Sequence, residues 1–282
     1  MTKSNNGNME QKTVLITGVT GTIGKAAATE LAKDNCRLIL LGRDMGRLSA
    51  VKSEIAALTG NNDLDIYVAD LSEPESIRQT VRNIKRKYTY LNVLVNVAGV
   101  FKNKRLENSA GLEYMFATNH LGPFVLTNEL LDLLKSGKGR IINISAPSTT
   151  KINFDNLQGK NKFSTGFLGL FGASKMMNIM FTYALARRLD GSGVSAIVFH
   201  PGLVKSGLTN EMPAILDFIF KRISSKPDKA AGMIRHLAFE EEFESKNGKF
   251  FQFQGKEIKS AKYSYDQGLQ EKLWTISEQL SE

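Results

Sequence analysis

Cysteine is almost absent from this 282-residue chain, and long apolar runs are absent altogether. The single Cys36 excludes an internal disulfide framework and any metal site built from several thiolates. The three histidines are far apart, so no metal site is expected. No stretch approaches the roughly 18 uninterrupted apolar residues of a membrane span. These features predict a chain without a membrane span or metal centre, in a reducing, cytoplasmic setting.

The two most unusual segments are a polar start and one short apolar stretch. Residues 1–12 lack the apolar core of a signal peptide and are expected to form a disordered tail before a single domain, 13–282. Residues 213–223 (PAILDFIFKRI) are apolar but carry three charges. This pattern favours a lid or core helix over a helix lying on a membrane surface.

Basic residues outnumber acidic ones, giving a net charge of +9. They are spread along the chain and accompany no nucleic-acid-binding signature. A solvated surface with a local anion pocket is therefore favoured over a nucleic-acid or anionic membrane partner. The competing hypothesis, a nucleic-acid-binding module, predicts affinity that falls steeply with salt.

Apolar segments of strand length alternate with amphipathic segments of helix length. Continuously apolar strands are typical of a parallel sheet covered by helices on both faces. The pattern therefore predicts one α/β domain with a doubly wound parallel sheet. The expected strands are 13–17, 37–41, 65–69, 91–99, 140–145 and 194–199, and the first helices are 25–33, 45–58 and 73–87.

A glycine-rich turn follows the first expected strand and contains Gly18, Gly21 and Gly24. Such glycines let the backbone approach a pyrophosphate, and the next helix presents unpaired N–H groups to the anion. The second strand ends at Arg43, whose guanidinium suits the 2′-phosphate of NADP. Asp44 follows and fits a helix cap. The sequence thus favours NADP(H) over NAD(H).

These motifs resemble the short-chain dehydrogenase/reductase family, and most of all its retinol-dehydrogenase-like branch. The resemblance covers about residues 13–280. It rests on TGVTGTIGK, Asp70-Leu71, NVAG, TNHLGPF, RIINIS, FDNLQG, FGASK, ALARRL, HPGLVKSGL and LWTISEQL. It implies a Rossmann-type fold and an oxidoreductase.

The resemblance also implies roles for individual residues. Asn119 and Lys175 match catalytic positions, with Asn119 supporting a water relay beside the lysine. Asp70 would face the adenine amino group and Asn96 would anchor the sheet. The implied cofactor-binding residues are Gly18, Thr20, Gly21, Thr22, Ile23, Gly24, Arg43, Asp70, Leu71, Asn96, Ala98, Gly99, Lys175, Pro201, Gly202 and Val204.

Two departures from the family pattern concern the chemistry itself. The family's tyrosine acid, four residues before the lysine, corresponds to Phe171, and its serine, 25 residues earlier still, corresponds to Ala146. Val97 and Thr22 are lesser departures. A lost acid costs about 10²–10⁴ in rate and a lost oxyanion donor about 10²–10³, so simple carbonyl reduction should be very slow. Ser145, Ser148, Thr149 and His200 are expected to be structural rather than replacement acids.

Three explanations stay open: a cofactor-binding pseudoenzyme, a reaction without a tyrosine acid such as conjugate reduction or cyclisation, or an engineered pair of substitutions that traps a ligand. The apolar segment 209–225 falls at the family's substrate lid and favours a small lipophilic substrate. By resemblance, a homodimer could form through residues 118–134 and 171–189.

Overall fold

The computed structural model describes residues 11–164, 169–204 and 226–282. Most of the expected polar tail, the apolar segment 213–223 and the expected substrate lid lie outside the described residues. Within the described ranges, no helix is long and apolar enough to cross a membrane.

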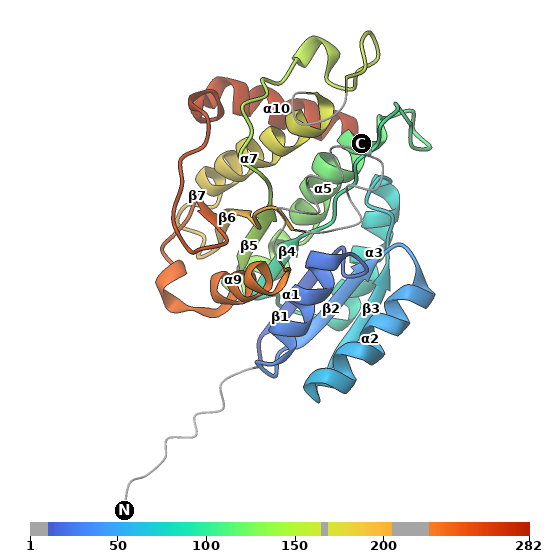
Figure 1. Ribbon diagram of the computed structural model, residues 1–282, viewed down its shortest axis with the longest axis vertical. Helices are drawn as coiled ribbons and strands as arrows, with labels where there is room; N and C mark the ends of the chain where they lie inside the picture. The colour runs from blue at the N-terminus through green and yellow to red at the C-terminus, as the bar shows by residue number, and fades with distance from the viewer. Residues whose placement is uncertain (1–10, 165–168, 205–225) are drawn as a thin grey trace, which may run out of the picture.

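Seven parallel strands form one sheet, in the order β3-β2-β1-β4-β5-β6-β7 (Figure 1). The chain builds outward from β1 to β3, returns to place β4 beside β1, and then builds in the opposite direction. This confirms the doubly wound parallel sheet and places its switch point between β1 and β4, where such folds bind ligands. The strands are β1 (Thr13–Thr17), β2 (Arg37–Gly42), β3 (Leu64–Val68), β4 (Val93–Asn96), β5 (Arg140–Ile144), β6 (Ser195–His200) and β7 (Lys249–Gln252).

All six expected strands occur within one residue of their expected bounds except the fourth, which runs from Val93 to Asn96 instead of 91–99. A seventh strand, β7, was not expected. β4 ends at Asn96 rather than Gly99, because the N–H groups of Val97 and Ala98 leave the ladder and donate to the Thr17 hydroxyl at 3.0 and 3.1 Å. β7 was not predicted, since this four-residue edge strand has only Phe250 and Phe251 buried.

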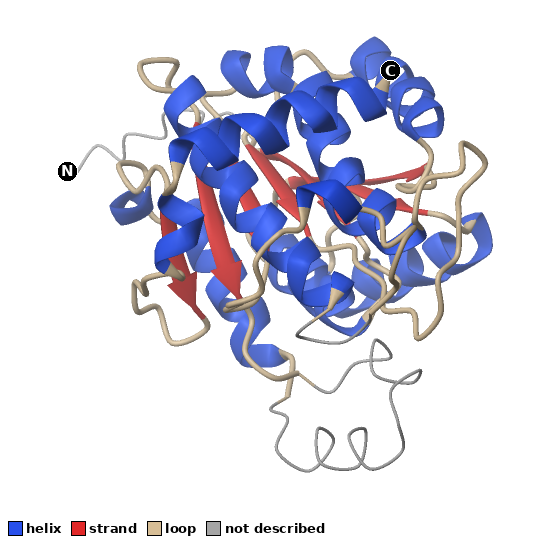
Figure 2. Cartoon of the chain, turned by 90° about the horizontal axis from the view of Figure 1, so that it is seen from above, coloured by secondary structure: helices blue, strands red, loops and turns tan. Residues whose placement is uncertain are grey.

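Helices cover both faces of the sheet (Figure 2). The three helices predicted early in the chain are confirmed within a few residues, and Asp44 caps α2 by accepting from the Arg47 N–H at 2.7 Å. The helices are α1 (Thr22–Ala32), α2 (Met45–Thr59), α3 (Pro74–Lys87), α4 (Tyr114–Phe116), α5 (Gly122–Glu129), α6 (Leu131–Ser136), α7 (Leu170–Arg188), α9 (Asp228–Phe239) and α10 (Gln267–Ser281).

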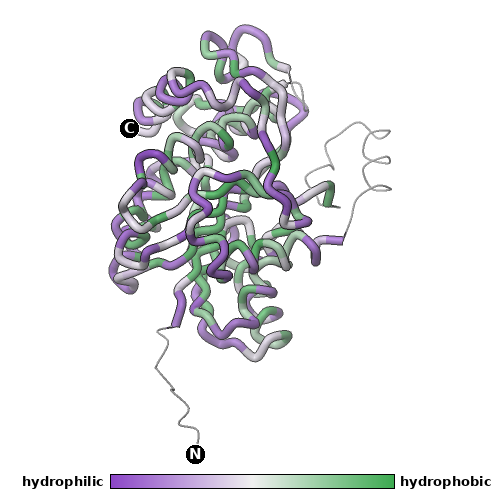
Figure 3. The backbone as a smooth tube through the Cα atoms, turned by 90° about the vertical axis from the view of Figure 1, so that its left-hand side faces the viewer, coloured by the Kyte–Doolittle hydropathy of each residue, from purple (hydrophilic) through white to green (hydrophobic). Residues whose placement is uncertain are grey.

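Two hydrophobic cores lie on opposite faces of the sheet. Leu15 of β1 points into a core with α3, α5, α7 and α10, whereas its neighbours Val14 and Ile16 point into a core with α1, α2 and α9. This two-sided burial explains why the strands are apolar at every position. Figure 3 shows the same arrangement, with hydrophobic segments in the centre and hydrophilic ones around them.

The C-terminal helix α10 packs against α7 and η1 (Ala117–Leu121). Trp274 lies 4.9 Å from the ring of Phe124 and 5.8 Å from that of Phe181, centroid to centroid. His120 Nε2 and the Ser277 hydroxyl are 2.8 Å apart. Because α10 covers part of the helices expected to pair in a homodimer, a dimer would have to form around it or use another surface.

Candidate functional site: a cofactor-shaped cavity at the strand ends

The backbone around the turn between β1 and α1 leaves no room for a side chain at Gly18 or Gly24. Gly18 has φ +71°, and a Cβ there would lie 2.8 Å from the Ala98 backbone. A Cβ on Gly24 would lie 2.2 Å from the Gly18 carbonyl oxygen. The first turn of α1 has no side-chain cap at Gly21, so its N–H groups are available to an anion. This cradle fits the pyrophosphate of a dinucleotide.

Two arginines stand beside the turn, at the end of β2 and in the first turn of α2. Arg43 donates to the Tyr114 hydroxyl, and Arg47 donates to the Thr20 carbonyl oxygen at 3.3 Å. Both are exposed and line the cavity. Sequence reasoning found Arg43 but missed Arg47, although a basic residue one turn into the helix after this strand was a usable signal.

Asp70 follows β3, and one of its carboxylate oxygens is already engaged. Its Oδ1 accepts from the N–H and the hydroxyl of Ser72 at 2.9 and 2.7 Å. Its neighbours Ala69 and Leu71 line the cavity. The contact of Asp70 with adenine therefore stays a prediction.

A buried chain of amides ties the ends of β4 and β5 to the helices behind them. Asn96 donates to Asn143 Oδ1 at 2.8 Å and to the Thr127 hydroxyl at 3.2 Å. Asn143 in turn donates to the Thr182 hydroxyl at 3.0 Å. Asn96 is buried and is not among the described residues that line the cavity, so its role as an anchor beside the cofactor stays a prediction. Asn143 was missed, and its signal was a polar residue inside an otherwise apolar strand.

Asn119 lies in η1, a π-helical turn of the kind often found at functional sites. Its side chain accepts from the Val100 N–H at 2.7 Å and donates to the Val100 carbonyl at 2.9 Å. A Cβ on Gly99 would lie 3.5 Å from Asn119 Oδ1 and 3.6 Å from Lys175 Nζ. Asn119 therefore holds the 99–100 loop against the lysine, while its part in a water relay stays a prediction.

Helix α7 brings Phe171 and Lys175 to the cavity one turn apart. The Phe171 ring is 3 % exposed and meets Phe101 edge-on, with centroids 5.5 Å apart. Lys175 Nζ lies 5.4 Å from the centre of the Phe171 ring. Burial lowers the pKa of Lys175 to about 8. Phe101, which sequence reasoning missed, thus completes an apolar wall beside the amine.

The hydroxyls next to Ala146 hold α7 in place. Ser145 donates to the Lys175 carbonyl oxygen at 2.7 Å, and Ser148 donates to the Gly172 carbonyl oxygen at 2.9 Å. Both bonds favour the structural role expected for these serines. Ala146 itself lines the cavity, and no tyrosine is among the described residues that do so.

The segment after β6 closes the far side of the cavity. Gly202 has φ +78°, and a Cβ there would lie 2.8 Å from the Phe253 ring. The buried Nδ1 of His200 has no hydrogen-bond partner within the described part of the chain, and burial lowers the pKa of this histidine. Residues 200–204 line the cavity together with Lys175.

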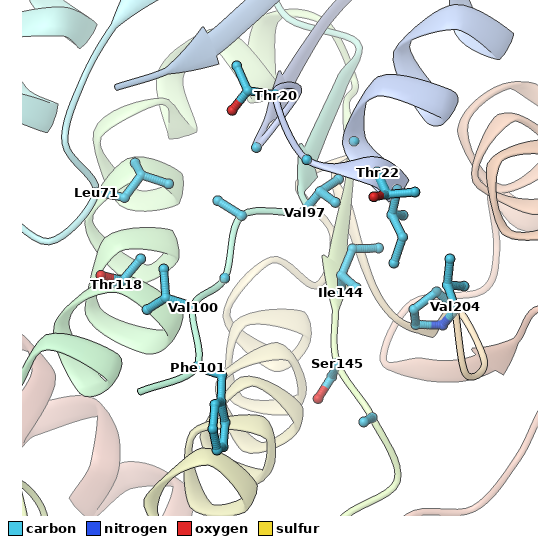
Figure 4. Close-up of a pocket in the computed structure, with 18 of the residues that line it drawn as sticks. Thr20, Thr22, Leu71, Val97, Val100, Phe101, Thr118, Ile144, Ser145 and Val204 are labelled. Carbon is cyan, nitrogen blue, oxygen red and sulfur yellow. The ribbon is translucent and has the colours of Figure 1, made fainter. Parts of the chain in front are cut away.

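The resulting cavity has a volume of about 970 Å³, and Figure 4 shows Thr20 and Thr22 at one end and Phe101 and Ser145 at the other. Asp70, Asn96 and Asn119 are not among its described lining residues. Thr118 lines it and was missed. The predicted residues that line it are Gly18, Thr20, Gly21, Thr22, Ile23, Gly24, Arg43, Leu71, Ala98, Gly99, Ala146, Phe171, Lys175, Pro201, Gly202 and Val204.

Residues 12–215 match the family model described as short chain dehydrogenase. Mouse (Mus musculus) retinol dehydrogenase 12 is 35% identical over 271 residues, which cover 94% of this chain and 85% of that protein. The chain belongs to the short-chain dehydrogenase family. This confirms the resemblance to the short-chain dehydrogenase/reductase family and to its retinol-dehydrogenase-like branch.

Solved structures support the same assignment. An uncharacterized protein from Mycobacterium paratuberculosis is 26% identical, with a TM-score of 0.78 over 96% of this chain and 93% of that one. A short chain dehydrogenase from Burkholderia cenocepacia J2315, solved in complex with NADP, is 25% identical, with a TM-score of 0.69 over 86% of this chain and 95% of that one. Family members therefore share the Rossmann-type fold seen here.

Proposed function

We propose that this chain binds NADP(H) and acts as an oxidoreductase on a carbonyl, alcohol or conjugated group of a small lipophilic substrate, with an atypical active site. One observation carries the proposal. A single cavity runs from the glycine cradle to Lys175 and ends against Phe171, where the family pattern has its tyrosine acid.

The preference for NADP(H) is supported by charge at the adenosine end. Arg43 and Arg47 provide two guanidinium groups, and such groups bind phosphate by charge-assisted hydrogen bonds. Asp44, the nearest carboxylate along the chain, accepts from the Arg47 N–H as a helix cap. The NADP complex of the Burkholderia relative agrees with this preference.

At the other end, bound NADPH would supply a hydride. Lys175 would hold ribose hydroxyl groups with its amine, while Phe171 and Phe101 would exclude water. Because a phenyl ring cannot donate a proton, charge developing on a carbonyl oxygen would lack its usual acid. A conjugated substrate spreads that charge over more atoms, which favours conjugate reduction over simple ketone reduction. The retinol dehydrogenases among its relatives are consistent with a lipophilic substrate.

The alternative is a catalytically silent protein that binds the cofactor for a regulatory or partner-binding role. The edge-on packing of Phe101 against Phe171 favours it, because this contact stabilises the site as an apolar core rather than a reaction centre. A non-redox enzyme such as a cyclase could use the same apolar wall.

Fluorescence titration with NADPH tests the proposal on the wild type, Phe171→Tyr and Phe171→Tyr/Ala146→Ser. We expect all three to bind NADPH. In steady-state assays of the same proteins, we expect the wild type to reduce a conjugated enone and simple carbonyl reduction to rise in Phe171→Tyr and further in the double variant. Absence of NADPH binding by all three would refute the cofactor site. Tight binding without reduction of any enone or carbonyl by the wild type would favour the silent protein.

A further inference from the structure

The amine of Lys175 occupies an unusual position for a lysine. It lies at a cavity wall, 5.4 Å from the centre of the Phe171 ring and beside the backbone of Gly99. In the described part of the chain, no carboxylate pairs with it and no acceptor receives a hydrogen bond from it. The side chain of Lys25, by contrast, is 43% exposed and pairs with a carboxylate: its Nζ is 2.9 Å from Glu54 Oε1.

This environment favours the neutral, nucleophilic form of the amine. Burial brings the pKa of Lys175 from 10.5 to about 8. At neutral pH its neutral fraction is therefore about two orders of magnitude above that of an ordinary lysine. A lysine desolvated in an apolar pocket is an activated nucleophile toward carbonyl compounds. Among the described residues that line the cavity, none is a tyrosine that could share a proton with the amine.

The walls around the amine define which carbonyl compound fits. Val97, Val100, Phe101, Ile144 and Phe171 line the same cavity as Lys175, so an apolar chain can be buried there. Figure 4 shows Val97, Val100, Phe101 and Ile144 around the cavity. Aldehydes are the reactive partners for amines, and the wall selects those with an apolar tail.

We propose that Lys175, in the cofactor-free protein, binds a lipophilic aldehyde covalently as a reversible imine. The amine nitrogen forms a bond to the aldehyde carbon, and the two protons of the neutral amine pass to the carbonyl oxygen. That oxygen leaves as water, and a C=N double bond remains. No electrons are gained or lost, so the reaction needs no cofactor and does not depend on the proposed oxidoreductase activity.

Reductive trapping tests this site. Cofactor-free protein is incubated with octanal and sodium cyanoborohydride at neutral pH, and peptide mapping by mass spectrometry follows each lysine with time. We expect Lys175 to gain an octyl group at least about tenfold faster than any exposed lysine, because its amine is more often neutral. Labelling of exposed lysines ahead of Lys175 would overturn the proposal.

Two variants test whether the fast labelling belongs to Lys175. Lys175→Arg keeps a cation but cannot form a stable imine, so the fast phase of labelling should disappear. Lys25→Arg is the matched control, since Lys25 is exposed and paired with Glu54, and it should keep the fast phase. Site mapping of the wild type decides the matter even if Lys175→Arg folds poorly. NADPH titration of the same preparation reports separately on the proposed function.

Discussion

Lys175 Nζ lies above the face of the Phe171 ring, 5.4 Å from its centroid, where the family pattern has a phenol. The ring face attracts the ammonium, but this attraction is modest, roughly 0.5–2 kcal/mol. Burial outweighs it, because the pKa of Lys175 still falls to about 8. The two residues therefore form a site with a readily deprotonated amine and no proton-donating side chain.

Restoring the phenol should restore carbonyl chemistry. We expect Phe171→Tyr to raise the rate of carbonyl reduction by about 10²–10⁴, with a further and non-additive gain from Ala146→Ser. Steady-state kinetics with NADPH and a simple ketone measures this. The control is Phe101→Tyr, which adds a phenol on the other member of the ring pair. An equal gain in that control would show that the position on α7 does not matter.

Arg43 and Arg47, which line the cavity beside the glycine turn, should set the choice between NADPH and NADH. Arg43→Glu is expected to raise the Kd for NADPH by about 10–100-fold and to leave NADH binding nearly unchanged, because one charge-assisted bond is worth about 1.5–3 kcal/mol. Arg47→Ala should act in the same direction with a smaller effect. Arg235→Ala, which removes an arginine of α9 that pairs with Asp34, is the matched control. Equal losses for both cofactors would contradict a role in 2′-phosphate recognition.

Alanine at Gly24 of the cradle and alanine at Gly232 of α9 should change the free energy of unfolding in opposite directions. Gly24→Ala should destabilise the protein by about 1–3 kcal/mol or more and weaken NADPH binding, because its Cβ would overlap the Gly18 carbonyl. Gly232→Ala, in α9 with no atom within 4 Å of the added Cβ, should stabilise by about 0.5–1 kcal/mol. Urea unfolding measures both, and a tolerated Gly24→Ala would mean that the cradle can relax.

Sequence patterns predicted the strands, helices and turns that are determined by residues close together in the chain. Continuous apolar runs indicated the inner strands, and the glycine spacing indicated the cradle. β7 was missed because two buried phenylalanines do not make a periodic pattern. Arg47, Phe101 and Asn143 were missed because each acts through a partner distant in sequence, such as Phe171 for Phe101. The covering of α7 by α10 is likewise a tertiary contact that local periodicity does not encode.

His120 should make stability depend on pH. Its ring is fully buried, and burial lowers its pKa to about 4, below the ordinary 6.5. The folded protein thus holds the neutral ring, whereas the unfolded chain takes up a proton below pH 6.5. The contribution of His120 is complete above pH 6.5 and declines as pH falls toward 4, by a few kcal/mol at most.

Urea unfolding at pH 7.5 and pH 5 measures this effect. His120→Gln should reduce the loss of stability between the two pH values, since its side chain does not titrate. His236→Gln, at an exposed position on α9, is the matched control and should keep the wild-type difference. A wild-type difference in His120→Gln would assign the acid sensitivity to other groups.

Trp274 should be the main contact that holds α10 against α5 and α7. Its indole packs on Phe124 and Phe181, and the Arg188 guanidinium lies 3.8 Å from its centroid. We expect Trp274→Ala to cost about 3–5 kcal/mol, whereas Leu58→Ala, at a position 67 % exposed on α2, should change stability by less than about 0.5 kcal/mol. Sedimentation should show self-association of Trp274→Ala above the wild-type level, because loosening α10 exposes the apolar face of α5 and α7. If Trp274→Ala loses the expected stability but self-associates no more than the wild type, the apolar face of α5 and α7 does not pair between copies.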